Sequence, residues 1–298
     1  MKKVIATILS IATLCTVLAG CGKTVTTSVS STPEAATSVP VSTSINSTSE
    51  EAGPVAAYTT SLEDIKAKGE LVIGLDDTFA PMGFRDEAGN LVGFDIELAT
   101  AVCEELGVKA KFQTIDWDAK ELELTSGNID CIWNGMSITD ERQQSMSLSQ
   151  PYLNNIISVM TTNKVEVRAF TDLNGLNIGI QAGSAALEAV QGSSVYDSIK
   201  DSITEYPTYD EAILDMQAGR LDCLIIDEVY GSYKNSKMNN IFMPSRIDFG
   251  DDLYAIGFRK SDSALCNSVN DAINALIANG KAAEISTKWF GKDIVVKP

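Results

Sequence analysis

The sequence contains no histidine, and this absence excludes several kinds of chemistry. Without imidazole there is no Ser-His-Asp or Cys-His catalytic arrangement and no metal site that depends on histidine. Six cysteines in 298 residues show no CxxC spacing, which argues against a zinc site or a dithiol redox centre. Basic residues are also few: 23 Lys and Arg against 40 Asp and Glu give a net charge of −17. Such a surface repels nucleic-acid phosphates and anionic lipids. We therefore expect no nucleic-acid partner, no metal and no cofactor.

Long apolar runs are scarce as well, and only Val4–Leu18 stands out. This run follows Lys2 and Lys3 and ends in the sequence Leu18-Ala19-Gly20-Cys21. A basic start and about 15 apolar residues predict a secretory signal peptide over residues 1–20, which is short for a membrane span. The last four residues resemble a bacterial lipobox, which implies cleavage before Cys21 and lipid attachment to that residue. A buried N-terminal helix and a plain anchor helix are the alternatives.

Residues 21–60 have the composition of a tether. Seventeen residues between Gly22 and Thr60 are Ser or Thr, and prolines are scattered among them. So little apolar surface cannot offset the entropy lost on ordering, so we expect a disordered spacer. Beyond it lie four cysteines, Cys103, Cys131, Cys223 and Cys266. An exported protein permits disulfides, but the sequence selects none of the three possible pairings, and we expect mostly free, packed thiols.

From Leu62 onward the sequence has the pattern of an α/β protein. Apolar residues make up 44% of the chain and charged residues 21%, and the length allows about two domains. Strands and helices alternate, with strands expected at 71–75, 109–115, 129–133, 178–180 and 221–226 and helices at 95–106, 118–126, 185–190 and 210–218. The segment Gly127–Cys131 (GNIDC) is similar to the segment Gly219–Cys223 (GRLDC). These features predict two lobes of similar build, each a mainly parallel sheet flanked by helices.

Polar residues cluster where the expected strands end, which is where open α/β sheets bind ligands. The candidates in the first half are Asp76, Phe79, Trp117, Asn134, Gly135 and Ser137, and those in the second half are Gln181, Ser184 and Asp227. Phe79 and Trp117 could equally be core residues. Asp227 could pair with a ligand cation or cap the next helix.

Arg142 is the strongest single signal among the polar residues. Thr139 has the features of a helix N-cap, and Arg142 occupies the third helical position, where a capping box places Glu or Gln. A cation at the positive end of a helix costs about 0.3–1 kcal/mol, which suggests that Arg142 binds an anion. Pairing with Asp140 or Glu141 is the alternative. The turn Gly183–Ser184 also precedes a helix start. Together these groups provide what a zwitterion needs.

The segment Gly135–Arg142, followed by Ser149–Tyr152, resembles the polar amino-acid solute-binding proteins of ABC importers. The resemblance runs from Leu62 to the C-terminus. It implies a two-lobed clamshell of the type II periplasmic-binding-protein class, with two hinge crossings and no catalytic residues. The implied domains are residues 61–155 plus 254–298 for lobe 1 and 156–253 for lobe 2, after the signal peptide (1–20) and the lipidated tether (21–60).

The resemblance also implies a role for each site residue. Arg142, with Ser137 and the backbone of Ser184 and Ala185, corresponds to the group that binds the ligand carboxylate. Asp227 and the Gly135 carbonyl correspond to the group that binds the ammonium. Five residues would face the ligand side chain: Asp76, Phe79, Trp117, Asn134 and Gln181. The implied ligand is a polar amino acid, with glutamine, arginine or lysine, and cystine all open.

The expected protein is a monomeric receptor that delivers its ligand to a membrane permease. It would sit on the outer face of the cell membrane, in a bacterium with a Gram-positive envelope, and touch the membrane only through its lipid. Two alternatives share this fold: a dehydratase of the cyclohexadienyl or arogenate type, and a sensor subunit that signals to a membrane receptor. Fold alone does not separate them.

Overall fold

Strands and helices alternate along the chain from Leu62 to Phe290. The computed structural model describes residues 59–298, so the expected signal peptide, Cys21 and nearly all of the tether lie outside the described residues. The helices are α1 Leu62–Lys68, α2 Phe94–Leu106, α3 Lys120–Thr125, α4 Asp140–Ser145, α5 Ala185–Gln191, α6 Tyr196–Ile199, α7 Tyr209–Gln217, α8 Glu228–Lys237, α9 Ser263–Ala278 and α10 Lys281–Phe290, with short 3-10 turns η1 Trp117–Ala119, η2 Phe170–Leu173 and η3 Lys200–Ser202. The strands are β1 Glu70–Leu75, β2 Thr78–Phe79, β3 Gly83–Arg85, β4 Leu91–Val92, β5 Lys109–Thr114, β6 Cys131–Ser137, β7 Met146–Leu148, β8 Leu153–Thr162, β9 Ile178–Gln181, β10 Ile203–Tyr206, β11 Cys223–Asp227 and β12 Phe242–Arg259.

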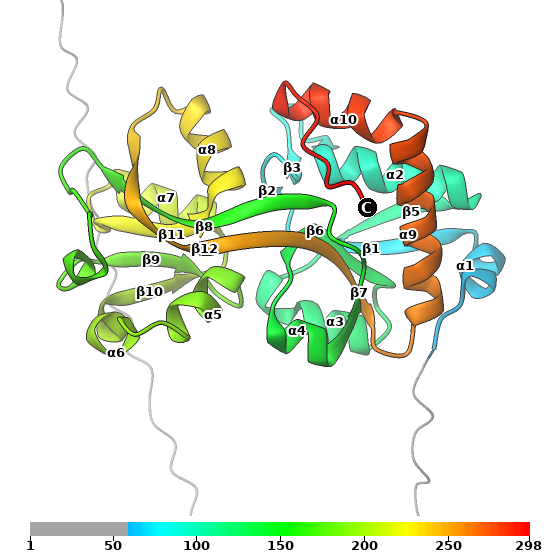
Figure 1. Ribbon diagram of the computed structural model, residues 1–298, viewed down its shortest axis with the longest axis horizontal. Helices are drawn as coiled ribbons and strands as arrows, with labels where there is room; N and C mark the ends of the chain where they lie inside the picture. Colours follow the sequence, from blue (N-terminus) through cyan, green and yellow to red (C-terminus); the bar gives the residue numbers. More distant parts are fainter. Residues whose placement is uncertain (1–58) are drawn as a thin grey trace, which may run out of the picture. The chain divides into compact units, whose positions relative to one another are not determined.

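The main sheet has two parallel halves joined by two antiparallel strands. Its order is β10-β9-β11-β8-β12-β6-β1-β5, with β7 paired to β12. On one side β5, β1 and β6 run parallel, and on the other β10, β9 and β11 do the same. We call these halves, with their flanking helices, the first and the second lobe. Figure 1 shows β8 and β12 running side by side from one lobe to the other. The predicted two-lobed α/β fold with two crossings is confirmed.

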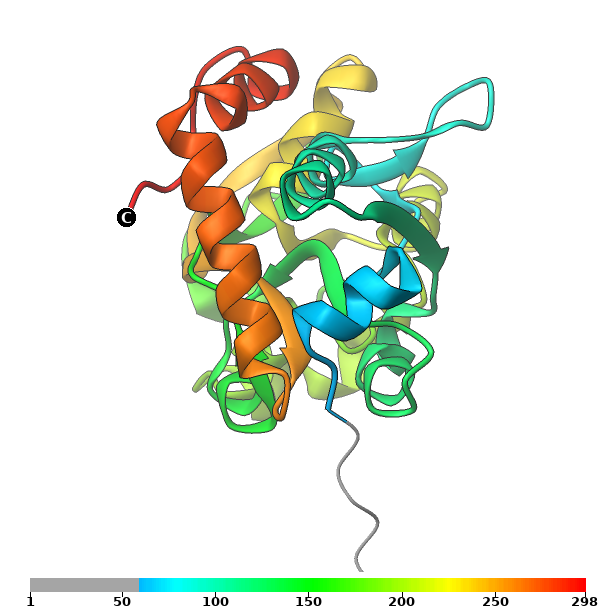
Figure 2. The same cartoon turned by 90° about the vertical axis from the view of Figure 1, so that its right-hand side faces the viewer.

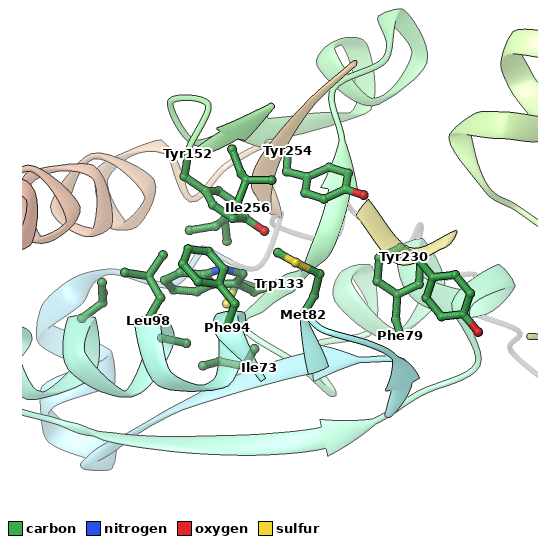
Figure 3. Close-up of a cluster of buried hydrophobic side chains, with 14 of the residues drawn as sticks. Ile73, Phe79, Met82, Phe94, Leu98, Trp133, Tyr152, Tyr230, Tyr254 and Ile256 are labelled. Carbon is green, nitrogen blue, oxygen red and sulfur yellow. The ribbon is translucent and has the colours of Figure 1, made fainter. Parts of the chain in front are cut away.

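The largest hydrophobic cluster begins in the first lobe, between the sheet and helix α2. Phe94 and Tyr152 stack with ring centroids 6.3 Å apart, and Trp133 lies 6.2 Å from Tyr152 (Figure 3). Helices α9 and α10 pack against α2, and Figure 2 shows the long α9 running along the outside of this lobe. The second lobe has its own cluster around Ile178, Ile180 and Ile225. The largest cluster also includes Leu224, Ile226 and Tyr230 of the second lobe, so one core spans both lobes and the second lobe adds another.

Three element boundaries differ from the sequence prediction, and each bears on the site. Helix α2 begins at Phe94 with Gly93 as its N-cap, so Asp95 is not the cap that we expected. The expected helix at 118–126 is divided into η1 and α3. Strand β6 extends to Ser137: every residue from Cys131 to Ser137 is buried, and Met136 and Ser137 pair with β12 beyond an irregularity in the register. The predicted cap at Thr139 is confirmed, since its side chain accepts a hydrogen bond from the Arg142 amide at 3.2 Å.

The four cysteines of the described region are free and buried. Burial raises the pKa of the Cys103 and Cys223 thiols to about 12, so neither is a reactive thiolate. This agrees with the expectation of packed thiols. None of the helices within residues 59–298 combines the length and apolar character that a membrane span requires.

Candidate ligand-binding site

A closed cavity between the two lobes is lined by the eleven residues that the sequence singled out. They are Asp76, Phe79, Trp117, Asn134, Gly135, Ser137, Arg142, Gln181, Ser184, Ala185 and Asp227. The free volume of the cavity is small, about 10 Å³, which holds about one water. The lobes are therefore closed over the site.

The sheet explains why these residues meet. Asp76 follows β1, and Asn134, Gly135 and Ser137 form the last part of β6. In the second lobe Gln181 ends β9, Ser184 caps α5, and Asp227 ends β11. Because parallel strands present their carboxyl ends at the same edge, each lobe offers one polar edge to the other.

Arg142 lines the cavity, and hydrogen bonds to both lobes hold its side chain in place. Its side chain is 2% exposed and lies between the two lobes. One terminal nitrogen donates to the Ser137 carbonyl at 2.9 Å, and the other donates to the Gly183 carbonyl at 3.2 Å and lies 3.5 Å from Glu188. The third nitrogen, Nε, has no hydrogen-bond partner among the described residues. The guanidinium therefore retains donor capacity, and the alternative of a surface pair with Asp140 or Glu141 is wrong.

Asp227 sits in a buried network at the hinge. Its Oδ1 accepts hydrogen bonds from Asn155 Nδ2 at 2.7 Å and from the Tyr254 hydroxyl at 2.9 Å. Asn155 also donates to Asp252 at 2.9 Å, and Asp252 accepts a further bond from Ser137 at 2.7 Å. Burial, and then repulsion from Asp252, raises the pKa of Asp227 to about 7. Asp227 is the N-cap residue of α8 by position, but its side chain makes no capping bond to the helix and is directed into the hinge network instead.

Asp76 is the second carboxylate that lines the cavity. One of its oxygens accepts bonds from the Thr78 amide at 2.9 Å and hydroxyl at 2.7 Å. The other accepts a bond from Gln181 Nε2 at 3.0 Å, across the cleft. Asn134 fixes the backbone here by accepting from the Asp76 amide at 3.1 Å. Burial raises the pKa of Asp76, with a smaller contribution from Asp77. A carboxylate in this position favours a ligand group that carries an N–H donor.

Gly135 brings the backbone to the cavity wall in a conformation that suits glycine. Its φ is +58°, and a Cβ added there would lie 2.8 Å from the ring of Phe79. Below it, Asp95 accepts bonds from the Gly135 amide at 2.8 Å and from the Tyr152 hydroxyl at 2.9 Å. Burial raises the pKa of Asp95 to about 7. Asp95 therefore orients the Gly135 peptide instead of capping α2.

Aromatic rings close the cavity. Phe79 of the first lobe stacks on Tyr230 of the second, with centroids 5.1 Å apart and planes 20° from parallel. Figure 3 shows the two rings lying face to face at the edge of the cluster. Phe79 and Trp117 are 6% and 8% exposed, so both serve as core residues as well as lining residues. The two alternatives raised by the sequence are thus not exclusive.

Four residues around the cavity were missed by the sequence analysis: Asp95, Lys120, Asn155 and Asp252. Lys120 donates to the Gly183 carbonyl of the other lobe at 2.8 Å. Lys120 is one of four charged residues between Trp117 and Leu124, so the local pattern does not distinguish it from its more exposed neighbours. The hinge position of Asn155 is equally inconspicuous in the sequence. No group of three or more Cys, Asp or Glu side chains between residues 59 and 298 is arranged to hold a metal ion.

Comparison with known proteins agrees with this geometry. Residues 71–292 match the family model of bacterial extracellular solute-binding proteins, family 3. The chain belongs to this family. It is 30% identical over 241 residues to the L-cystine-binding protein TcyJ of Escherichia coli, covering 78% of this chain and 87% of that protein. It is 31% identical over 251 residues to an L-arginine-binding protein of Pseudomonas aeruginosa, covering 81% and 96%.

Among solved structures, the fold is similar to an ABC uptake transporter substrate-binding protein from Streptococcus pneumoniae with bound histidine. The TM-score is 0.75 and the identity 37%, over 79% of this chain and 98% of that one. This family 3 protein therefore shares its fold with a substrate-binding protein whose structure contains an amino acid.

Proposed function

We propose that this family 3 protein captures a polar amino acid between its lobes and delivers it to an ABC importer permease. One observation carries the proposal: Arg142 and Asp227 are both buried and both line the same closed cavity. A guanidinium suits an α-carboxylate, and a carboxylate next to the Gly135 backbone suits an α-ammonium. The backbone amides of Ser184 and Ala185 would assist Arg142, as the family resemblance implies.

The charges of the cavity favour an amino acid with a cationic side chain. Among residues 59–298, three charged side chains line it: Asp76, Arg142 and Asp227. One guanidinium and two carboxylates match a ligand with one carboxylate and two cationic groups, because buried charges require partners. In this arrangement Asp76 and Gln181 receive the side chain, while Phe79 and Trp117 cover its stem. Arginine and lysine fit this pattern best, glutamine fits with one charge unmatched, and acidic amino acids are excluded.

The amino-terminal region suggests how the receptor stays near its permease. A lipid on Cys21 would hold the protein at the outer face of the membrane. Residues 22–60 would then set how far the folded lobes can move from that surface. The expected role is transport by a monomer, and no residue of the cavity is assigned a catalytic step. Capture of a permease by the purified protein in detergent extracts would support transport, whereas capture of a membrane receptor would support a sensing role.

A thermal-shift panel of all amino acids plus cystine tests the proposal. A ligand present at a hundred times its dissociation constant stabilises the native state by about 2.7 kcal/mol and raises the melting temperature. We expect a clear shift with arginine or lysine and none with aspartate or glutamate. A flat panel from folded protein would contradict the proposal, and conversion of prephenate or arogenate would replace it with a dehydratase activity.

A further inference from the structure

Lys120 is a buried cation whose environment depends on the second lobe. Its side chain is 2% exposed, although α3 lies at the surface of the first lobe. The ammonium lies 5.2 Å from the centre of the Trp117 ring and donates to the Gly183 carbonyl of the second lobe at 2.8 Å. The Gly183 turn approaches η1 closely, since a Cβ on Gly183 would lie 2.7 Å from an Asp118 carboxylate oxygen. Separation of the lobes would remove the part of this cover that Gly183 provides.

Arg142 binds the same carbonyl oxygen as Lys120. The two cations therefore share one acceptor, at 2.8 Å and 3.2 Å, and each residue is 2% exposed. The carboxylates that face them are only partly buried. Glu121 lies 3.4 Å from Lys120 and is 44% exposed, and Glu188 lies 3.5 Å from Arg142 and is 31% exposed. Asp118, on the adjoining turn, is exposed. Solvent screens these acids more than it screens the repulsion between the two buried cations.

The pKa of Lys120 follows this balance. Burial is the largest effect that lowers the pKa of Lys120, and the charge of Arg142 is the next. Glu121 and Glu188 raise this pKa by smaller amounts. An exposed lysine has a pKa near 10.4, so closure itself disfavours the charged form of Lys120. By linkage, the charge on Lys120 opposes closure of the lobes. A carboxylate bound to Arg142 would neutralise the neighbouring cation and relieve part of this cost.

We propose that Lys120 makes closure of the lobes conditional on a carboxylate at Arg142. It is a positioning residue that acts through Gly183 and Arg142 and does not line the cavity. In the ligand-free protein, two like charges brought to one carbonyl keep the lobes apart. When an amino acid arrives, its carboxylate pairs with Arg142 and the same Lys120–Gly183 bond then helps to hold the lobes together. The inference rests on the proposed function for its ligand, but its ligand-free part does not.

The test measures the distance between the lobes by pulsed electron paramagnetic resonance. Spin labels are placed on cysteines introduced at Ser126 and Ser194, exposed positions on the first and second lobe. Cys15 and Cys21 are replaced by serine, and the four described cysteines are buried. The variant is Lys120→Met, which keeps the length of the side chain without its charge. The matched control is Lys111→Met, which removes an exposed lysine paired with Glu70.

Without ligand at pH 7.5, we expect open lobes in the wild type and the control. Lys120→Met should raise the closed-to-open ratio by about tenfold for each unit by which closure lowers the pKa of Lys120. Raising the pH towards 10.5 should close the wild type and leave Lys120→Met unchanged. Equal distances in the two proteins, a more open Lys120→Met, or a wild type already closed without ligand would each overturn the inference.

Two added probes separate this inference from the proposed function. L-Arginine should close the wild type, whereas L-argininamide, which lacks the carboxylate, should close only Lys120→Met. If neither probe closes any variant, the choice of ligand is wrong, and the ligand-free comparison still decides the role of Lys120. Melting temperatures of the ligand-free variants serve as the check on folding.

Discussion

Arg142 in the first lobe and Asp227 in the second line one closed cavity, and each is held in place by its own hydrogen bonds. Arg142 is fixed by carbonyl oxygens of both lobes, and Asp227 by Asn155 and Tyr254 at the hinge. The positive charge of Arg142 lowers the pKa of Asp227 against the larger effect of burial. The two groups are therefore coupled across the space where a zwitterion would bind, and several predictions depend on that coupling.

Removal of the guanidinium should abolish binding. Arg142→Ala would strand the ligand carboxylate in a dry site, a loss of about 3–5 kcal/mol or a hundredfold or more in affinity. Isothermal titration calorimetry measures it directly. Arg168→Ala is the control, since the Arg168 side chain is exposed and pairs with Glu166 of its own loop. Micromolar binding by Arg142→Ala would contradict the assignment.

Ligand affinity should depend on the charge of Asp227. Its pKa of about 7 means that the carboxylate becomes protonated as the pH falls below 7, and a neutral acid no longer pairs with an ammonium. We expect affinity to fall by up to about tenfold per pH unit between pH 7 and 5. In Asp227→Asn the affinity should be lower at pH 8 and nearly independent of pH. Asp222→Asn, at the opposite end of β11, where Asp222 accepts hydrogen bonds from Asn177, should retain the wild-type profile.

Asp76 should decide between cationic and neutral side chains. Asp76→Asn keeps the shape of the side chain but removes its charge, so arginine or lysine should lose about tenfold or more in affinity while glutamine changes little. The control is Asp77→Asn, because Asp77 pairs with Arg85 and does not line the cavity. Equal losses for charged and neutral ligands would show that Asp76 shapes the pocket without selecting charge.

Asp95 should make the ligand-free protein less stable as the pH rises. Its pKa is about 7 in the folded state and near 3.9 when unfolded, so the native state binds more protons between these values. The free energy of unfolding should therefore fall from pH 4 to pH 7, with Asp227 contributing in the same direction. Urea unfolding at pH 5 and pH 8 measures this fall. Asp95→Asn should reduce it, and an unchanged fall would show that Asp95 does not titrate in this range.

The sequence located the cavity because its lining follows from local rules. Asp76, Gln181 and Asp227 each end or follow a strand of a parallel trio, and such ends must meet at one edge. Arg142 was found from a conflict between its charge and its place in the first turn of a helix. Both signals are contained within a few residues, so they survive without knowledge of the tertiary structure.

The missed residues depend on contacts between distant segments. Lys120 meets Gly183 across 63 positions, and Asn155 meets Asp252 across 97. Strand β12 also shifts register twice near Asp248, which no periodic pattern predicts. Asp95 was misread because an aspartate at the start of a helix has the same local pattern whether it caps the helix or turns into the core.

The most direct test of the central claim compares three forms of one ligand by calorimetry. The amino acid with the largest thermal shift is titrated beside its α-amide, which lacks the carboxylate, and its Nα-acetyl derivative, which lacks the ammonium. If Arg142 binds the carboxylate and Asp227 binds the ammonium, the unmodified amino acid binds one to one. Each derivative then loses about a hundredfold or more in affinity. Binding of either derivative as tightly as the parent would contradict the account.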